Sequence, residues 1–308
     1  MTTRRRFLTI IAGAAALPAL GPAATASPAP TAAAPARWHG IALGASAEIL
    51  IAHGDGARLL KRAVGEIRRL EGIFSLYRPE SALSRLNREG ALSSPPFEML
   101  ELLTIAGSIH RRTEGAFDPT IQPLWALHAQ CASRGRVPTT AEIAAARART
   151  GWENLRLEAG SVSFRRPAMS LTLNGIAQGY IADRVAAMLR REGVENVLVN
   201  AGEITALGGG PDGSGWPVEI AGSKAPPLPL KDLSIATSAP LGTTFDARGR
   251  LGHIIDPRSG RPTARQAQVS VIAPSAAVAD GLSTAFCLME KSRIDSTLNS
   301  GERAIVMA

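Results

Sequence analysis

The chain has 308 residues, of which 45% are hydrophobic and 19% are charged, so it can bury a sizeable core and is not a disordered protein. Its formal net charge is +8 at pH 7, but the basic residues are scattered and aromatic residues make up only 4%, which argues against a nucleic-acid platform. Two cysteines and five dispersed histidines do not form a zinc motif.

The N-terminus has the pattern of an export signal. Residues 3–8 (TRRRFL) carry a twin-arginine pattern, an apolar run over 9–20 follows, and small residues occupy 24–26. This order predicts a twin-arginine signal over residues 1–26, cleaved near Ser27, and therefore a periplasmic protein. The alternative, a membrane-anchoring helix, is disfavoured because the run is short and rich in Ala and Gly.

The rest of the chain divides simply. Residues 27–36 (SPAPTAAAPA) form a Pro/Ala linker with nothing to bury, which leaves 37–308 as one domain. Past the N-terminus no apolar run is long enough to cross a bilayer, so we expect no transmembrane segment after signal cleavage.

Helical and strand patterns are mixed within this domain. In chain order, the predicted elements are a strand over 41–51, a helix over 57–74, a loop and short helix capped by Ser81, helices over 97–112 and 140–150, a hairpin of 155–157 with 161–164, a helix over 174–191, strands over 197–199, 216–220, 233–236 and 268–273, and a helix from Ala276. Strands and helices do not alternate regularly. We therefore predict an α+β fold with mixed sheets and packed helices.

The last helix contains polar residues in an apolar run, VADGLSTAF over 278–286. Asp280 and Thr284 are four residues apart, so on a helix they share one face, with Ser283 beside them. A carboxylate among apolar side chains is costly unless a cation or hydrogen-bond donors meet it. The segment therefore predicts a partner for Asp280, which is either a bound ligand, an arginine or a helix end.

Other polar clusters each have an ordinary structural interpretation. Residues 115–120 (GAFDPT) suit a turn capped by its own aspartate, and 174–175 (NG) suits the entry to a helix. Gly175 and Gly179 are also spaced to permit close helix packing. Residues 253–257 (HIIDP) read as a strand that runs into a turn.

Taken together, the order and spacing of these clusters resemble the FAD:protein FMN transferase family, the ApbE-like proteins. The resemblance runs from Leu43 to the C-terminal helix and rests on residues 75–79 with Ser81 and Asn87, 115–120, 174–180 with Asp183, 200–203, 236–238, 253–257 with Gly260, and 279–280 with 283–284. Several separated motifs in the right order are more specific than any one of them.

The resemblance implies a magnesium site. Its ligands would be Asp280, Thr284 and the backbone carbonyl of Gly175, with Ser283 as a further candidate. The chemistry is consistent, because Mg²⁺ prefers hard oxygen ligands and completes its shell with phosphates and water.

The resemblance also implies where FAD binds. The dinucleotide would contact Leu43, Tyr77, Ala116, Phe117, Asp118 and His253, and it would pass Thr172 and Gln178 near its phosphates. The family often has an acid at the position of Thr172 and a lysine at that of Gln178, and these departures bear on turnover more than on FAD binding. His253 is the candidate general base, because imidazole titrates near neutral pH.

The implied reaction is Mg²⁺-dependent transfer of the FMN moiety of FAD onto a Thr or Ser hydroxyl of an acceptor flavoprotein, with release of AMP. The form GIAQGY over 175–180 is similar to the branch associated with nitrous oxide reductase maturation, in which the acceptor is a membrane flavoprotein. Two alternatives remain at this point: a periplasmic FAD carrier that does not transfer, and an FAD pyrophosphatase that releases free FMN.

Overall fold

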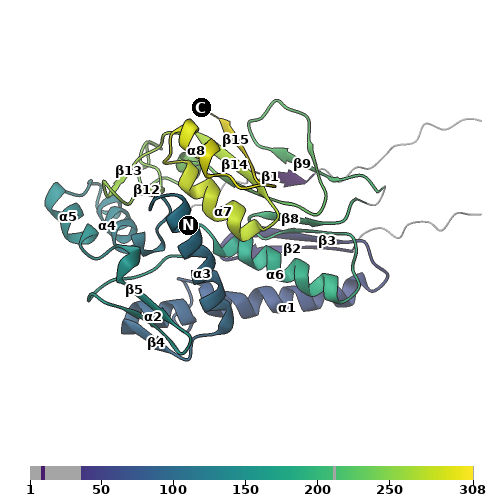
Figure 1. Ribbon diagram of the computed structural model, residues 1–308, viewed down its shortest axis with the longest axis horizontal. Coiled ribbons are helices and arrows are strands. Elements are labelled where there is room, and N and C mark those ends of the chain that lie inside the picture. Colours follow the sequence, from purple (N-terminus) through teal and green to yellow (C-terminus); the bar gives the residue numbers. More distant parts are fainter. Residues whose placement is uncertain (1–7, 11–35, 211–212, 308) are drawn as a thin grey trace, which may run out of the picture.

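A computed structural model describes residues 8–10, 36–210 and 213–307. Its centre is a seven-stranded sheet with the order β15-β14-β11-β8-β7-β3-β2, in which neighbouring strands run antiparallel (Figure 1). The strands are β2 (Ala36–Ala42), β3 (Ala45–Ile51), β7 (Val197–Asn200), β8 (Ile204–Leu207), β11 (Ser234–Ser238), β14 (Gln268–Ala273) and β15 (Arg303–Met307). The mixture of sheets and helices confirms the predicted α+β class.

Both faces of this sheet are apolar and both are covered. Successive side chains of a strand point to opposite faces, so Ile49 and Ile51 of β3 enter one hydrophobic cluster and Leu50 enters another. Helices α1 (Gly56–Phe74), α6 (Ala177–Arg191) and α7 (Ala276–Phe286) lie on the first face (Figure 1). A second sheet, of order β1-β9-β10, supplies the cover of the other face from β1 (Leu8–Ile10), β9 (Trp216–Ile220) and β10 (Leu228–Leu230).

The helices near the start of the domain agree closely with the sequence prediction. Helix α3 (Phe97–Arg112) has the predicted bounds, and α2 (Ala82–Glu89) begins after Ser81, whose hydroxyl accepts a hydrogen bond from the Ser84 N–H at 3.0 Å. The predicted hairpin is present as β5 (Leu155–Glu158) and β6 (Ser161–Phe164), with β4 (Ala91–Ser93) beside β6.

A smaller lobe has its own hydrophobic cluster. It contains α4 (Gln122–Ser133), α5 (Thr140–Arg147), β12 (Ile255–Asp256) and β13 (Arg261–Pro262). Leu124, Ile143, Ala146 and Ile255 form its core. The remaining short elements are η1 (Pro119–Ile121), η2 (Trp152–Asn154), η3 (Pro240–Gly242) and α8 (Lys291–Thr297).

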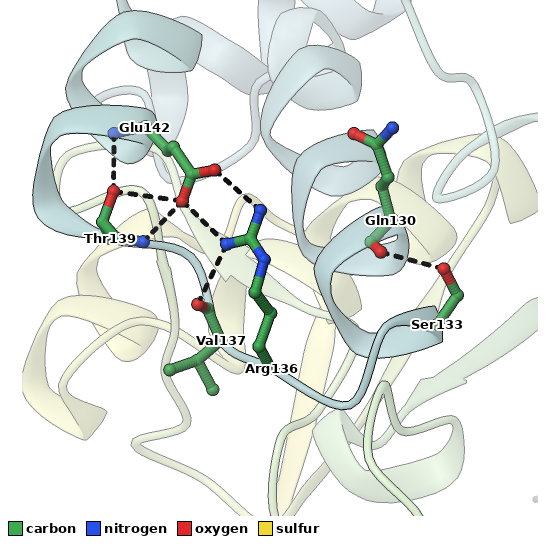
Figure 2. Close-up of polar contacts among 6 residues, drawn as sticks. All are labelled: Gln130, Ser133, Arg136, Val137, Thr139 and Glu142. Atoms are coloured by element: carbon green, nitrogen blue, oxygen red, sulfur yellow. Dashed lines mark hydrogen bonds and ion pairs between the residues drawn. The ribbon is translucent and has the colours of Figure 1, made fainter.

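A local cap fixes the start of α5 (Figure 2). The Thr139 hydroxyl accepts from the Glu142 N–H at 3.2 Å, and the Glu142 carboxylate accepts from the Thr139 N–H at 2.8 Å. Arg136 donates to the same carboxylate at 2.8 Å. This is a capping box closed by an arginine, and it places the cap at Thr139, one residue before the predicted start.

The predicted strand over 41–51 is in fact a hairpin. Its turn lies at Leu43 and Gly44, which have φ values of 46° and 78°. The sequence pattern missed β2 because this strand is the outermost of the sheet and most of its side chains are at least partly exposed, so it lacks an apolar alternation.

Other elements were missed or misplaced as well. Helix α6 begins at Ala177, so residues 174–176 form the turn before it. Helix α4 and strand β8 were not predicted. The Pro-rich interval 225–229, expected only to separate strands, contributes to β10, and Pro229 is tolerated there because β10 is an edge strand.

Strand β1 pairs with β9 through residues that belong to the predicted export signal, Leu8–Ile10. The rest of that signal, and the linker up to residue 35, lie outside the described residues. Within the described part of the chain, no helix combines the length and the apolar character needed to cross a bilayer. Cys131 and Cys287 are both buried free thiols, and burial raises the pKa of Cys287 to about 12.

Candidate active site

Helix α7 brings the three predicted metal-binding side chains together. Ser275 caps the helix by accepting from the Val278 N–H at 3.3 Å. Asp280 is 3% exposed, Ser283 is fully buried and Thr284 is half-buried. The Gly179 N–H of α6 donates to Asp280 Oδ2 at 3.2 Å. The buried Asp280 carboxylate therefore contacts the N-terminal turn of α6, whose dipole favours an anion.

The turn before α6 presses against Thr284. A Cβ atom at Gly175 would lie 3.0 Å from Thr284 Oγ1 and 3.6 Å from the Phe117 ring, so a larger residue here would crowd Thr284. In a helix that extended back to Gly175, the Gly179 N–H would donate to the Gly175 carbonyl. It donates to Asp280 instead, which keeps the Gly175 carbonyl out of the helical ladder.

These groups fit a magnesium ion. The set is one carboxylate, one or two hydroxyls and a backbone carbonyl, all hard oxygens. Gly175 and Thr284 are in contact, and Asp280 is one helical turn before Thr284. Over residues 36–210 and 213–307 no group of three His, Cys, Asp or Glu side chains could hold a metal, so a site here depends on hydroxyl, carbonyl and phosphate oxygens.

A second carboxylate holds the start of α7. Asp183 of α6 accepts from the N–H groups of Ala276 and Ala277 at 2.8 and 3.0 Å and from the Ser275 hydroxyl at 2.8 Å. Burial raises the pKa of Asp183, although these hydrogen bonds oppose that rise. The two helices can approach this closely because residue 179 is a glycine: a Cβ atom there would lie 2.2 Å from the Ala276 carbonyl oxygen.

The segment with Ala116, Phe117 and Asp118 joins this cluster through Phe117, which is buried and reaches Gly175. Asp118 Oδ1 accepts from the Thr120 N–H at 2.8 Å and from the Thr120 hydroxyl at 2.7 Å. The pKa of Asp118 is raised because burial outweighs these bonds. The turn predicted from the sequence is thus present, and it also reaches the site.

Leu43 and Tyr77 form a different edge. The Leu43 N–H donates to Glu71 Oε1 at 2.8 Å, which holds the hairpin turn. A Cβ at Gly44 would lie 4.0 Å from the Tyr77 ring, and Tyr77 is 68% exposed. Among the described residues, no hydrogen bond or ion pair joins Leu43 or Tyr77 to the α7 cluster. An exposed aromatic ring beside an apolar turn suits a planar ligand.

Thr172 is partly buried, whereas Gln178 is buried. The Thr172 N–H donates to the Pro119 carbonyl at 2.8 Å, which ties the strand-like segment before Gly175 to the Asp118 turn. Gln178 is 6% exposed, and its side chain lies where a Cβ at Gly202 would stand. The structure therefore places Gln178 against the 200–203 turn.

His253 has a defined ring orientation. Its Nδ1 lies 3.1 Å from the carbonyl oxygens of both Pro240 and Thr243. Since both neighbours only accept, Nδ1 carries a proton in either charge state, and Nε2 holds the lone pair when the ring is neutral. His253 is thus anchored to the 240–243 segment, which follows β11 in the chain.

Ser238 belongs to this site and was not assigned a role from the sequence. Its hydroxyl lies 2.8 Å from Ser283 Oγ and 3.3 Å from Thr284 Oγ1. A serine at the end of a strand gives no local signal of this contact, which arises only when β11 packs beside α7. Asp183, named among the motif residues, was likewise assigned no role, since its partners on α7 are more than ninety residues away in sequence.

A family model described as the ApbE family matches residues 43–307. The chain belongs to the ApbE family. This ApbE-family chain is 34% identical over 250 residues to the FAD:protein FMN transferase of Vibrio cholerae, covering 76% of this chain and 74% of the relative. It is 29% identical over 252 residues to the FAD:protein FMN transferase of Salmonella typhimurium, covering 76% and 72%.

Solved structures agree with this assignment. The flavin transferase ApbE from Vibrio cholerae has a TM-score of 0.75 at 28% identity, covering 89% of the ApbE-family chain and 98% of that structure. The Pseudomonas stutzeri flavinyl transferase ApbE has a TM-score of 0.76 at 28% identity, covering 89% and 94%. The family resemblance read from the sequence is confirmed.

Proposed function

We propose that this chain transfers the FMN moiety of FAD onto a Ser or Thr hydroxyl of an acceptor flavoprotein, releasing AMP. The observation that carries the proposal is the meeting of Asp280 and Thr284 with the Gly175 turn. It supports the proposal because hard oxygen ligands are what metal-assisted phosphoryl transfer requires. The relatives named above are enzymes of this activity.

Asp280, Thr284 and the Gly175 carbonyl would hold Mg²⁺. When bound, the ion supplies charge neutralisation for the diphosphate. One carboxylate gives a weak site by itself, so we expect metal and FAD to bind together. The Asp280 side chain also keeps its hydrogen bond to the Gly179 N–H, which fixes one carboxylate oxygen.

The reaction forms a bond between the acceptor oxygen and the phosphorus of the FMN phosphate. The bond from that phosphorus to the bridging oxygen breaks, and AMP leaves with this oxygen. The hydroxyl proton passes to Nε2 of His253, whose Nδ1–H is held by the Pro240 and Thr243 carbonyls. A positioned base contributes about 10²–10⁴-fold in such reactions.

As the family resemblance implies, the dinucleotide would contact both the Leu43 and Tyr77 edge and the Phe117 and Asp118 turn. Thr172 and Gln178 would lie near its phosphates, and Gln178 stands where lysine is frequent in the family. Gln178 packs against Gly202. A glutamine in place of the family's lysine removes a cation from the region near the phosphates. We expect this to lower turnover more than FAD affinity.

The direct test is to incubate the chain with FAD, Mg²⁺ and a candidate acceptor, and to look for in-gel flavin fluorescence on the denatured acceptor. Soluble FMN with AMP would indicate a pyrophosphatase, and unchanged FAD would indicate a carrier. Asp280→Ala should reduce transfer about 100-fold or more, because a metal ligand is worth several kcal/mol in the transition state. The matched control is Asp295→Ala, which removes an exposed carboxylate on α8.

We also propose export to the periplasm by the twin-arginine route, with a linker over 27–36 and the catalytic domain over 37–308. The support is the order of arginines, apolar run and small residues in the first 26 positions. Cell fractionation tests it: Arg4→Lys, Arg5→Lys and Arg6→Lys combined should retain the chain in the cytoplasm. A mature N-terminus far from Ser27 would contradict the predicted cleavage site.

A further inference from the structure

Three hydroxyl groups form a continuous chain between β11 and α7. The Ser283 hydroxyl donates a hydrogen bond to the Asp280 carbonyl oxygen at 3.0 Å. Ser238 Oγ lies 2.8 Å from Ser283 Oγ and 3.3 Å from Thr284 Oγ1. The chain therefore runs from Thr284 through Ser238 and Ser283 to a backbone carbonyl, and it joins two residues of α7 through a side chain of the sheet.

The direction of the protons in this chain is fixed from one end. The Asp280 carbonyl can only accept, so the Ser283 O–H is used there and Ser283 Oγ must accept from Ser238. Because the Ser238 O–H donates to Ser283, Ser238 Oγ can only accept a hydrogen bond from the Thr284 O–H. The Thr284 O–H consequently points at Ser238, and its lone pairs face away from β11.

We propose that Ser238 is a positioning residue that orients the Thr284 hydroxyl for metal binding; the proposal rests on the function proposed above. A hydroxyl binds a cation through a lone pair, so its proton must be directed elsewhere. Ser238 accepts the hydrogen bond from the Thr284 O–H and so directs that proton away from the cation. Groups that orient a metal ligand in this way commonly change metal affinity or activity by about 10–100-fold when they are removed.

The same geometry gives Ser283 a different role from Thr284. Ser283 is fully buried, and its hydroxyl is engaged with Ser238 and with the Asp280 carbonyl. It therefore sets the direction of the chain. The prediction that Ser283 binds the ion directly stays a prediction, which the Ser283→Ala variant tests.

Ser238 is well placed to orient its neighbour. It ends β11, where it pairs with Val269 of β14, and its carbonyl accepts a hydrogen bond from the Cys287 thiol at 3.5 Å. Its backbone is thus held by the sheet on one side and by the end of α7 on the other. The hydroxyl cannot follow Thr284 if the helix shifts, so it defines a fixed direction.

The test uses the full chain with Mn²⁺ as the probe, in the presence of FAD, and measures free Mn²⁺ by electron paramagnetic resonance alongside transfer activity. The variants are Thr284→Ala, Ser238→Ala, Ser283→Ala and Ser238→Thr. The control is Ser270→Ala, which removes a buried hydroxyl that lies 2.7 Å from Thr237 Oγ1 on the neighbouring strand. Thermal unfolding of each variant reports its general stability.

We expect Mn²⁺ affinity to fall most for Thr284→Ala, by about 10-fold or more for Ser238→Ala, and less for Ser283→Ala. Ser238→Thr should restore binding, and Ser270→Ala should lower only the melting temperature. Equal Mn²⁺ affinity in Ser238→Ala and Ser270→Ala would overturn the inference, and so would a Ser283→Ala loss as large as that of Thr284→Ala. A wild-type chain that binds neither Mn²⁺ nor FAD would instead overturn the proposed function.

Discussion

Two carboxylates hold the N-terminal ends of helices in this protein, and they do so in opposite settings. Glu142 lies three residues after Thr139, is partly exposed, and its pKa is lowered to about 2 by Arg136 and by the hydrogen bonds of the α5 cap (Figure 2). Asp183 is partly buried and caps α7 from α6, 93 residues away from Ala276, and its pKa is raised chiefly by burial. One cap is local and solvated, and the other is a tertiary contact.

The difference shows which cap matters to the site. The Glu142 cap fixes a single helix of the small lobe, and water can replace much of its contribution. The Asp183 cap joins α6, α7 and, through a hydrogen bond from the Thr205 hydroxyl at 3.3 Å, strand β8. Its hydrogen bond from the Ala276 N–H lies four residues before Asp280 on α7, so the position of the predicted metal ligands depends on this cap.

Removing the buried cap should have the largest effect. Asp183→Ala leaves the N–H groups of Ala276 and Ala277 buried without their acceptor, and we expect the free energy of unfolding to fall by about 2–5 kcal/mol. Urea denaturation measures the loss. The matched substitution Glu142→Ala should cost much less, and equal losses would remove the distinction between the two caps.

Close packing of the helices is the second requirement of the buried cap. Gly179→Ala would put a Cβ 2.2 Å from the Ala276 carbonyl oxygen, so α6 and α7 must separate, and we expect a loss of about 1–3 kcal/mol. Gly72→Ala is the control, because a Cβ at Gly72 in α1 meets nothing within 4 Å and should stabilise the helix. A stable Gly179→Ala variant with unchanged Mn²⁺ binding would contradict this packing.

The two carboxylates should respond to acid with opposite signs. The folded-state pKa of Glu142 is lowered to about 2 from an ordinary value of 4.5, so its contribution to stability is present above pH 4.5 and is lost as the pH falls towards 2. The pKa of Asp183 is raised above 3.8, so its ionisation weakens the fold as the pH rises through the shifted value. Unfolding of Glu142→Gln and Asp183→Asn between pH 2 and 6, each compared with wild type, should give differences that slope in opposite directions.

The smallest effect concerns the local cap at neutral pH. Glu142→Gln should lower the melting temperature only slightly, because the ion pair with Arg136 is exposed and the amide can still accept from the Thr139 N–H. The difference should shrink further in about 1 M salt, which screens exposed charges beyond about 3 Å. A salt-independent loss would show that the cap is more than an exposed ion pair.

The sequence predicted most of what is local. Helical spacing located α1 and α3 almost to the residue, and the capping residue of α2 was read directly from Ser81. The spacing of Asp280 and Thr284 placed both on one side of α7. The alternation rule failed for β2, because an outer strand with exposed side chains does not need an apolar pattern.

What could not be predicted is tertiary. No local pattern indicates that Ser238 meets Thr284 or that Asp183 caps α7, because these contacts exist only after the sheet and the helices have packed. The start of α6 was misplaced for a related reason: the Gly179 N–H is used by Asp280, which lies 101 residues further along the chain. Sequence reasoning thus named candidate ligands that lie together in the fold, and packing determines which groups contact them.

The loop that carries His253 is attached to two separate hydrophobic clusters at consecutive positions. Ile254 packs into the main core, whereas Ile255 packs into the small core with α4 and α5. A displacement of the small lobe relative to the main sheet must therefore move the imidazole at once, since a single peptide unit links the two anchors. A ligand that contacts both Phe117 and His253 would lock this joint, and its binding free energy would appear as added resistance of α4 and α5 to proteolysis.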